Sequence, residues 1–334
     1  MGLSDSLIHF ILIKKTRVEK MANELLVIGN GFDLAHEMKT RYHDFRDWLN
    51  RFAHKEYVAR MEGSLNCYGE MLWANLEENT RLLKNIDYKE KFYEHSSYLT
   101  EYSSTIINLT DDFVEYDDGN RRCETVADLM RDIFNQQGFQ HYLEEDFFWL
   151  YRLKSHFCEW VKSIELAKKP LYYIPQNALY LSFNYTNLLE NTYKIATENI
   201  LHIHGNTDRE IEFGNPDITS FIYKNEDTRA LGVKDEINHA LRSVYKDVNS
   251  IIRKNQLFFS TLEKIQKIYI LGHSMNEIDE PYFLKIKENV PSNTQWMASY
   301  YSEKDRLRAE ELIFNKLGVN VFEIKKLDNI LKSV

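Results

Sequence analysis

The stretch ELLVIGNGFDLAHEMKTRYHDF, which runs from Glu24 to Phe45, decides how the chain folds. Its apolar residues Leu25 to Ile28 lead directly into Gly29-Asn30-Gly31, and a polar segment that contains two histidines follows. A short apolar run bounded by glycine predicts a buried strand that ends in a tight turn. Such a turn either binds a nucleotide or only joins the strand to the next element.

The rest of the dinucleotide-binding fingerprint is missing from this stretch. That fingerprint has Gly or Ala where this chain has Leu34, and it has an acidic residue after a second strand about twenty residues later. From about Tyr42 to Lys169 the pattern is instead mainly helical, with apolar residues three and four positions apart in HYLEEDFFWLYRLKSHFCEWVKSIE (His141–Glu165). The glycine pair alone is therefore weak evidence for a nucleotide.

Strand signals return after Pro170 and alternate with helical stretches. The β-rich runs are Ala178–Phe183, Ile200–His204, Ile268–Gly272, Gln295–Tyr300 and Val319–Ile324. One helical stretch extends from Glu226 to Lys264, and another opens with the capping box Ser302-Glu303-Lys304-Asp305 and closes at Gly318. Strands that alternate with helices predict an α/β fold, a Rossmann-like parallel sheet covered on both faces.

The first strand is far from the others in the sequence, which implies a large helical insertion after it. We expect residues 21–48 and 170–334 to form the Rossmann-like domain, and residues 49–169 to form a helical insertion lobe over the strand ends. The first strand should lie inside the sheet. Residues 1–20 are expected to be a dispensable extension, and Met21 is as good a start as Met1.

Composition and charge exclude several classes of protein. The 334 residues carry a net charge of −9, which disfavours general binding to nucleic acid backbones. The three cysteines, Cys67, Cys123 and Cys158, form no CxxC pair, so we expect no structural zinc, no disulfide framework and a reducing, cytoplasmic setting. No window approaches the ~20 apolar residues that a membrane helix needs, so no membrane partner is expected.

Ligands of open parallel sheets bind at the carboxyl ends of the strands, so the residues just after each strand are candidates. Asn184 follows one strand, and its amide can accept and donate at once, although it or Thr186 could instead cap a helix. His202 and His204 are two residues apart and should share one face of their strand. They could hold a metal, place one general base beside a packed neighbour, or be two half-buried histidines.

The segment Gly272-His273-Ser274 resembles the start of a hydrolase nucleophile elbow, G-x-S-x-G. Asn276 stands where that elbow has its last glycine, and no histidine follows His273 in the chain. Because α/β-hydrolases have their histidine after the serine and the acid, we reject the esterase interpretation.

Four segments together resemble the AbiH family of bacterial abortive-infection proteins. They are GNGFDLAHEMKTRYHDF, FNYTNLLENTYK, HIHGN and ILGHSMNEIDEPYF, in that order between Leu25 and about Phe283. The first is long enough to be specific, whereas the helical insertion is poorly diagnostic. The resemblance implies a role in phage resistance.

The same segments more distantly resemble the sirtuin-like NAD-binding fold. Gly29-Asn30-Gly31 is similar to the glycine turn that opens on the NAD phosphates, and Asp44-Phe45-Arg46 to the Asp-Phe-Arg that closes that loop. Asn184 and His204 stand where such proteins have their active-site asparagine and general base. Gly272-His273-Ser274 is similar to the loop that lies against the cofactor.

Two departures from that pattern matter. The four-cysteine zinc module of deacetylating sirtuins is absent, and Thr186 stands where NAD-cleaving relatives often have Asp. The resemblance implies that Asn184 and His204 are catalytic. It implies NAD-binding roles for Gly29, Asn30, Gly31, Phe32, Asp33, Phe45, Arg46, Gly272, His273, Ser274 and Asp279. Asp279 could equally cap the helix that follows it.

The leading hypothesis is an anti-phage effector, an NAD glycohydrolase that takes NAD as its substrate and needs no metal. Asn184 would hold a water and ribose hydroxyls, and His204 would act as the base, with both side chains partly exposed to solvent. The alternatives are a metal-dependent hydrolase or nuclease built on His202, His204 and a carboxylate such as Asp279, and a non-catalytic nucleotide sensor. Expected partners are a small nucleotide, an unknown phage trigger and further copies of the chain.

Overall fold

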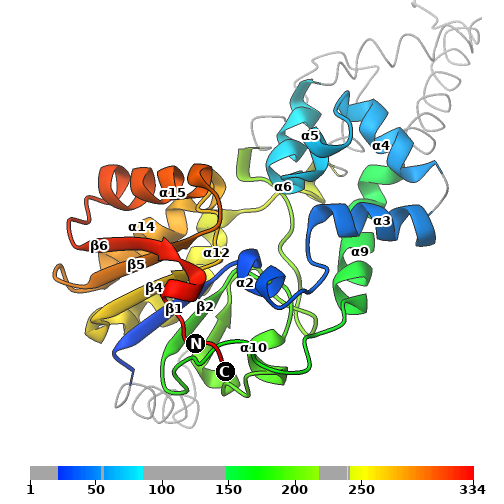
Figure 1. Ribbon diagram of the computed structural model, residues 1–334. Coiled ribbons are helices and arrows are strands. Elements are labelled where there is room, and N and C mark those ends of the chain that lie inside the picture. The colour runs from blue at the N-terminus through cyan, green and yellow to red at the C-terminus, as the bar shows by residue number, and fades with distance from the viewer. Residues whose placement is uncertain (1–21, 54–55, 86–147, 218–238, 240) are drawn as a thin grey trace, which may run out of the picture. The chain divides into compact units, whose positions relative to one another are not determined.

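The computed structural model describes residues 22–53, 56–85, 148–217, 239 and 241–334 (Figure 1). The chain divides into two compact units. Unit 1 consists of Met1–Phe45, Phe157–Pro216 and Lys246–Val334, and unit 2 consists of Arg46–His156 and Asp217–Tyr245. The predicted extension, residues 1–20, and residues 86–147 of the predicted insertion lie outside the described residues.

Unit 1 is built on a six-stranded sheet in which every strand pair is parallel (Figure 1). The strands are β1 (Glu24–Ile28), β2 (Leu179–Ser182), β3 (Ile200–His202), β4 (Lys267–Leu271), β5 (Gln295–Tyr300) and β6 (Phe322–Lys326). They lie in the order β3-β2-β1-β4-β5-β6, so β1 is inside the sheet between β2 and β4. The predicted Rossmann-like parallel sheet and the interior position of its first strand are confirmed.

Helices connect these strands. In unit 1 they are α2 (Asn30–Ala35), α10 (Leu188–Asn191), α12 (Val248–Lys254), α13 (Gln256–Ser260), α14 (Glu280–Asn289) and α15 (Glu303–Glu310), with the 3-10 turns η3 (Thr197–Asn199), η6 (Thr261–Lys264), η7 (Glu277–Asp279) and η9 (Leu327–Asn329) and the π-helical turn η8 (Glu311–Lys316). Along the chain, α3 (Tyr42–Phe52) and α9 (Phe148–Ser163) each cross from one unit to the other. The capping box predicted at the start of α15 is present, with hydrogen bonds exchanged between Ser302 and Asp305.

Both faces of the sheet are covered, because successive residues of a strand point to opposite faces. In β1, Leu25 and Val27 belong to one core cluster with apolar residues of α12, α14 and η8. Leu26 and Ile28 belong to a second cluster with Phe32 of α2 and apolar residues of α10. A strand buried on both faces requires a continuous apolar run, which explains the sequence LLVI.

Three segments differ from their predicted form. The last strand begins at Phe322 rather than Val319, because Val319 is buried in the core that follows η8. The third strand ends at His202, since residues 203–204 form a turn. Within the predicted helix Glu226–Lys264 the chain is not helical at Lys246, and residues 226–238 lie outside the described residues.

Unit 2, where it is described, is helical. Besides its parts of α3 and α9 it contains α4 (Tyr57–Leu65), α5 (Glu70–Trp73), α6 (Leu76–Asn79) and the 3-10 turn η1 (Thr80–Asn85). The Glu62 carboxylate accepts hydrogen bonds from Arg46 at 2.9 Å and from the Trp73 indole at 2.7 Å. Leu150 and Leu153 of α9 are buried, as their helical spacing predicts.

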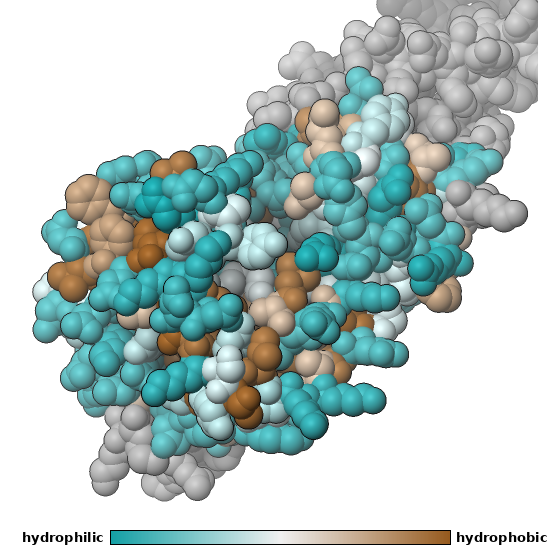
Figure 2. All heavy atoms as spheres, in the orientation of Figure 1, coloured by the Kyte–Doolittle hydropathy of each residue, from teal (hydrophilic) through white to brown (hydrophobic). Residues whose placement is uncertain are grey.

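The surface seen in Figure 2 is largely hydrophilic, with apolar residues in small groups. Leu307 of α15, Phe314 of η8 and Val321 are large apolar side chains that remain exposed. Within the described segments, no helix combines the length and the apolar character needed to cross a membrane.

The strand connections indicate where a ligand would bind. From β1 the chain passes to β2 and β3 on one side, and it later returns to β4 on the other side of β1. In open α/β sheets, ligands bind at the carboxyl ends of the two strands where the order reverses in this way. The residues after β1 and β4 are therefore central to the candidate site, and those after β2 lie next to them.

Candidate functional site at the carboxyl edge of the sheet

The glycine turn after β1 packs backbone to backbone against the loop after β4. The Gly29 N–H donates to the Leu271 carbonyl at 3.0 Å, and the Gly31 N–H donates to the Gly272 carbonyl at 2.7 Å. A Cβ on Gly272, whose φ is +65°, would overlap the backbone nitrogen of Phe32, and a Cβ on Gly29 would overlap His273. The close approach of the two loops therefore explains these glycines, and the Gly31 N–H already has a partner within the chain.

The next residues of α2 also have partners within the protein. Asn30 is exposed, and its side-chain amide donates to the Thr40 carbonyl at 2.9 Å. Phe32 is fully buried, and its ring lies 4.9 Å from that of His36 and 5.7 Å from that of Tyr193, between ring centroids. Phe32 is therefore a core residue that fixes α2 on the sheet.

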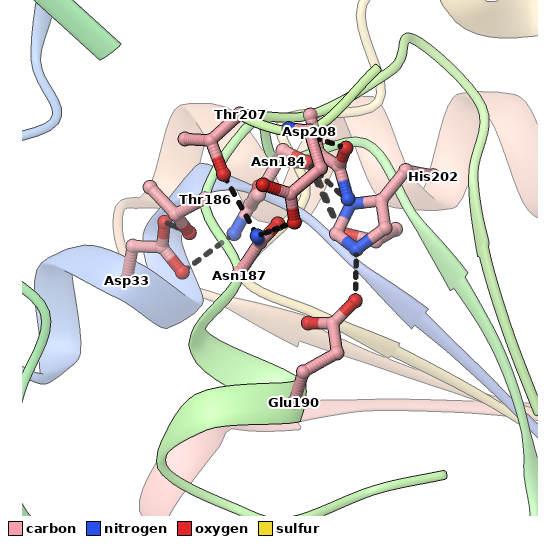
Figure 3. Close-up of polar contacts among 10 residues, drawn as sticks. Asp33, Asn184, Thr186, Asn187, Glu190, His202, Thr207 and Asp208 are labelled. Carbon is pink, nitrogen blue, oxygen red and sulfur yellow. Dashed lines mark hydrogen bonds and ion pairs between the residues drawn. The ribbon is translucent and has the colours of Figure 1, made fainter. Parts of the chain in front are cut away.

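Asp33 joins the glycine turn to the loop after β2 (Figure 3). Its Oδ1 accepts from the Asn184 side-chain amide at 2.8 Å, and its Oδ2 accepts from the Thr186 hydroxyl at 2.6 Å. The same Asn184 amide donates to the Gly29 carbonyl at 3.1 Å. All three side chains are at least nine-tenths buried. The turn after β1 and the loop after β2 are thus held together by one carboxylate.

Burial raises the pKa of Asp33 from 3.8 to about 6. The hydrogen bonds from Thr186 and Asn184 and the charge of His202 act in the opposite direction, because each stabilises the carboxylate. The carboxyl is consequently ionised for the most part at neutral pH and protonated in mild acid. Asp33 is therefore a buried charge whose state changes near physiological pH.

His202, the last residue of β3, holds the backbone of Asn184. Its Nδ1 lies 3.0 Å from the Asn184 carbonyl oxygen, and its Nε2 lies 2.8 Å from Oε1 of Glu190 on α10. A carbonyl and a carboxylate both accept hydrogen bonds, so the His202 ring lies between two acceptors. The contacts of His202 with Asn184 and Glu190 therefore join the Asn184 loop to α10.

A second asparagine lies at the start of α10. The Asn187 amide donates to the Thr207 hydroxyl and to the Asp208 carboxylate, each at 2.7 Å (Figure 3). These contacts tie the loop after β2 to the loop after β3. Among the described residues, the buried oxygens Asn184 Oδ1, Asn187 Oδ1 and Glu190 Oε2 have no hydrogen-bond partner.

His204 lies in the turn after β3, in a mostly aromatic environment. Its ring centroid is 5.2 Å from that of Phe183 and 5.4 Å from that of Tyr282, and its Nε2 is 3.3 Å from the Tyr282 hydroxyl. His204 is 3% exposed and Asn184 is 5% exposed, so the expectation that both side chains are partly exposed to solvent is wrong. Burial, together with the charge of Lys246 and the neighbouring His273, lowers its pKa well below the usual value, so the imidazole is neutral.

His273 follows β4 and is also neutral, because burial and the charge of Lys246 lower its pKa to about 3. The Met275 N–H donates to Nδ1 at 2.9 Å, so the ring proton is on Nε2. That Nε2 lies 3.5 Å from Oδ2 of Asp279, whose Oδ1 lies 4.0 Å from Nε2 of His204. Asp279 is the N-cap residue of α14, as the alternative expected, but its side chain makes no capping hydrogen bond, and its carboxylate oxygens lie near the two histidines instead.

The two histidines of the His-x-His segment do not form a pair. Because β3 ends at His202 and the chain then turns, the two rings have different partners, which are Glu190 for His202 and Tyr282 for His204. Both nitrogens of His202 are occupied by acceptors. No group of three or more His, Cys, Asp and Glu side chains suited to a metal ion is present in the part of the chain that the structure describes.

The sheet brings together most of the predicted site residues, but not all of them. Gly29, Asp33 and Asn184 form one group, and His204, His273 and Asp279 form a neighbouring group linked to it where His273 lies against Gly29. Three predicted residues have other surroundings. Phe45 packs on Phe157 and Trp160, Arg46 pairs with Glu62 in unit 2, and Ser274 is exposed.

Three further residues of the site could not be identified from the sequence. Glu190 lies within the segment FNYTNLLENTYK but is separated from His202 by twelve positions. Tyr282 belongs to an ordinary amphipathic helix. Lys246 is fully buried and acts on both His204 and His273, yet it comes from a stretch with a helical pattern. Spatial neighbours of this kind are revealed only by the fold.

Comparison with known proteins adds the family. The family model of bacteriophage abortive infection AbiH matches residues 25–300, which is most of the chain. The chain therefore belongs to the AbiH family, and the match supports a role in phage abortive infection. Neither the curated proteins nor the solved structures contained a match. The more distant resemblance to the sirtuin-like fold stays a prediction.

Proposed function

We propose that this AbiH protein cleaves NAD at the bond between nicotinamide and ribose, as the effector step of abortive infection. The observation that carries the proposal is the position of Asn184. Its amide lies 3.1 Å from the Gly29 carbonyl at the point where the strand order reverses, and its Oδ1 is buried with no hydrogen-bond partner among the described residues. A ligand in this kind of sheet is expected there.

The reaction needs little acid catalysis from the protein. When the glycosidic bond breaks, its electron pair goes to the ring nitrogen, and the cationic nicotinamide group leaves as neutral nicotinamide. The ribosyl group passes through an oxocarbenium-like state, as in other glycosidic cleavages. A water then forms the new bond to the anomeric carbon. The site therefore has to orient the ribose and one water, which suits the acceptor oxygen of Asn184.

His204 is the candidate base. Its buried, neutral imidazole is able to accept the proton that the attacking water loses. The products of the reaction are nicotinamide and ADP-ribose. Tyr282 and Asp279 lie beside Nε2 and would orient the ring and stabilise the imidazolium that forms. In this proposal NAD is a substrate rather than a resident cofactor, no metal takes part, and self-association and a phage-derived trigger control the activity.

The proposal is tested by nicotinamide release from NAD with purified protein, with and without a metal chelator. Asn184→Ala and His204→Ala should each lower the rate by ~10²-fold or more, in the range of a positioned catalytic group. His202→Ala is the matched control, since an orienting neighbour should cost less than the base. Because both Asn184 and His204 are buried, circular dichroism should first establish that each variant is folded. Equal rates in folded Asn184→Ala and wild type, or full inhibition by the chelator, would count against NAD cleavage by these residues.

A further inference from the structure

We propose that Asp33 does not contact the ligand but orients the Asn184 amide, so that the site presents an acceptor oxygen and recognises a hydroxyl group or a water. The identity of the ligand rests on the proposed function, whereas the orientation of Asn184 does not. Asp33 is thus a positioning residue. This replaces the NAD-binding role that the resemblance implied for it.

Asp33 is buried, and both of its carboxylate oxygens already accept hydrogen bonds from the protein. Its Oδ1 accepts from Asn184 at 2.8 Å, its Oδ2 accepts from Thr186 at 2.6 Å, and the residue is 1% exposed. Each oxygen of this buried carboxylate therefore has a donor within the protein. Because the carboxylate is buried behind Asn184 and Thr186, a ligand reaches these two side chains more readily than Asp33 itself.

The same contacts fix which way the Asn184 amide points. Its two N–H groups face the Gly29 carbonyl and the Asp33 carboxylate, and neither of these can donate a hydrogen bond. A flipped amide would place its oxygen against two acceptors, one of which is charged. The orientation with nitrogen toward Asp33 is therefore imposed by the partners.

The side-chain oxygen of Asn184 is therefore left as an acceptor, which only a hydrogen-bond donor can satisfy. Asn184 Oδ1 is buried and has no hydrogen-bond partner among the described residues. An unsatisfied buried acceptor is costly, so a ligand hydroxyl or a held water completes the site. A phosphate oxygen would meet another acceptor here. The position suits a sugar hydroxyl or the attacking water rather than the phosphates of a nucleotide.

The backbone of Asn184 has a second tether. His202 donates from Nδ1 to the Asn184 carbonyl at 3.0 Å and is itself paired with Glu190. The charge that acts on Asp33 is that of His202, which itself lies against Glu190. Because the His202 contact acts on the backbone, the side-chain orientation depends on Asp33 and the Gly29 carbonyl, and Asp33 is the side chain of the two that can be substituted.

The orientation is tested without any ligand, by nuclear magnetic resonance of protein labelled with ¹⁵N-asparagine. The Asn184 side-chain signals are those that Asn184→Ala removes. In wild type they should shift with a midpoint near pH 6 as Asp33 takes up a proton, and Asp33→Asn should abolish that step. Thr186→Val should move the midpoint to higher pH, because it removes a bond that stabilises the carboxylate. The amide of Asn255, which donates to the Ile251 carbonyl, is the control and should not move.

A second test swaps the residues at positions 33 and 184. Asn184→Asp places two carboxylates against each other and should lower NAD cleavage by ~10²-fold. The double variant D33N/N184D restores one donor and one carboxylate and again leaves an acceptor oxygen at position 184, so it should recover cleavage by about tenfold over N184D.

Two results would overturn the inference. One is a set of Asn184 signals that titrate identically in wild type and Asp33→Asn. The other is a folded double variant that shows no recovery although the wild type cleaves NAD. If no variant and no wild type cleaves NAD while the Asn184 signals follow Asp33, the proposed function fails and the positioning role stands.

Discussion

The side-chain amide of Asn184 donates a 2.8 Å hydrogen bond to the carboxylate of Asp33, although 151 positions separate the two residues. The contact follows from the sheet, since β1 and β2 are neighbouring parallel strands and each residue lies shortly after the end of its strand. One buried carboxylate thereby ties the glycine turn to the asparagine loop. The site is therefore sensitive to the charge state of Asp33.

The pKa of Asp33 predicts how stability depends on pH. Its value of about 6 in the folded chain exceeds the ordinary value of 3.8, so between these values the folded chain binds more protons than the unfolded chain. The free energy of unfolding should therefore fall, as pH rises from about 4 to about 6, by an amount on the order of 3 kcal/mol from this group.

Urea unfolding of wild type and Asp33→Asn at pH 4.5 and pH 7.5 measures this contribution. The difference between wild type and variant isolates Asp33, because the other titrating groups are common to both. Wild type should lose stability relative to Asp33→Asn at the higher pH. A difference that is the same at both pH values would show that Asp33 titrates at its ordinary pKa.

The glycine after β4 should be irreplaceable for reasons of packing. Gly272→Ala combines a φ of +65° with a Cβ that overlaps the backbone of Phe32. Gly318 has a φ of +64° and nothing within 4 Å of such a Cβ, so it is a matched control for the backbone conformation alone. We expect Gly318→Ala to lower the free energy of unfolding by about 1–2 kcal/mol, and Gly272→Ala by about 1–3 kcal/mol more. Equal losses in urea unfolding would contradict the close packing of the two loops.

Lys246 should control the pH range in which His204 is neutral. Burial lowers the pKa of His204 first, and the charge of Lys246 lowers it further. Lys246→Met removes that charge, so the pKa of His204 should rise and the acid limb of NAD cleavage should move to higher pH. Lys254→Met, at an exposed position paired with Glu212, is the control and should leave the profile unchanged. An unchanged acid limb in folded Lys246→Met would mean that His204 is not the base.

Ser274 should not act as a nucleophile. It is exposed, and the adjacent His273 is neutral with its Nδ1 accepting from the Met275 N–H. No histidine follows it in the order that an α/β-hydrolase needs. A serine-directed fluorophosphonate should leave the protein unlabelled by mass spectrometry. Stoichiometric labelling at Ser274 would restore the esterase interpretation.

The sheet was predictable from the sequence because its signals are local. The apolar run at Leu25–Ile28, the glycines after it and the capping box at Ser302 each specify one element without help from the rest of the chain. The last strand was misplaced, because Val319 has the side chain of a strand residue but is buried in the core behind η8. A β-branched residue does not by itself distinguish these two buried environments.

The site was less predictable because its partners are distant in the sequence. The period of two that should have put His202 and His204 on one face ends with the strand, at His202. The sirtuin-like resemblance implies a ligand contact for Asp33, but no pattern in the sequence pairs this residue with Asn184. Lys246 carries no motif at all, although its charge adds to the effect of burial in lowering the pKa of two histidines. Such pairings depend on the order of strands in the sheet.

The central claim is tested most directly by the fate of NAD in ¹⁸O-labelled water, with purified protein in buffer and in a lysate of phage-infected cells that supplies any trigger. Cleavage at the glycosidic bond should give free nicotinamide and ADP-ribose that carries one ¹⁸O at the anomeric carbon, detected by mass spectrometry, and folded Asn184→Ala should form neither. Intact NAD in both settings, or products of pyrophosphate cleavage in place of nicotinamide, would contradict the account.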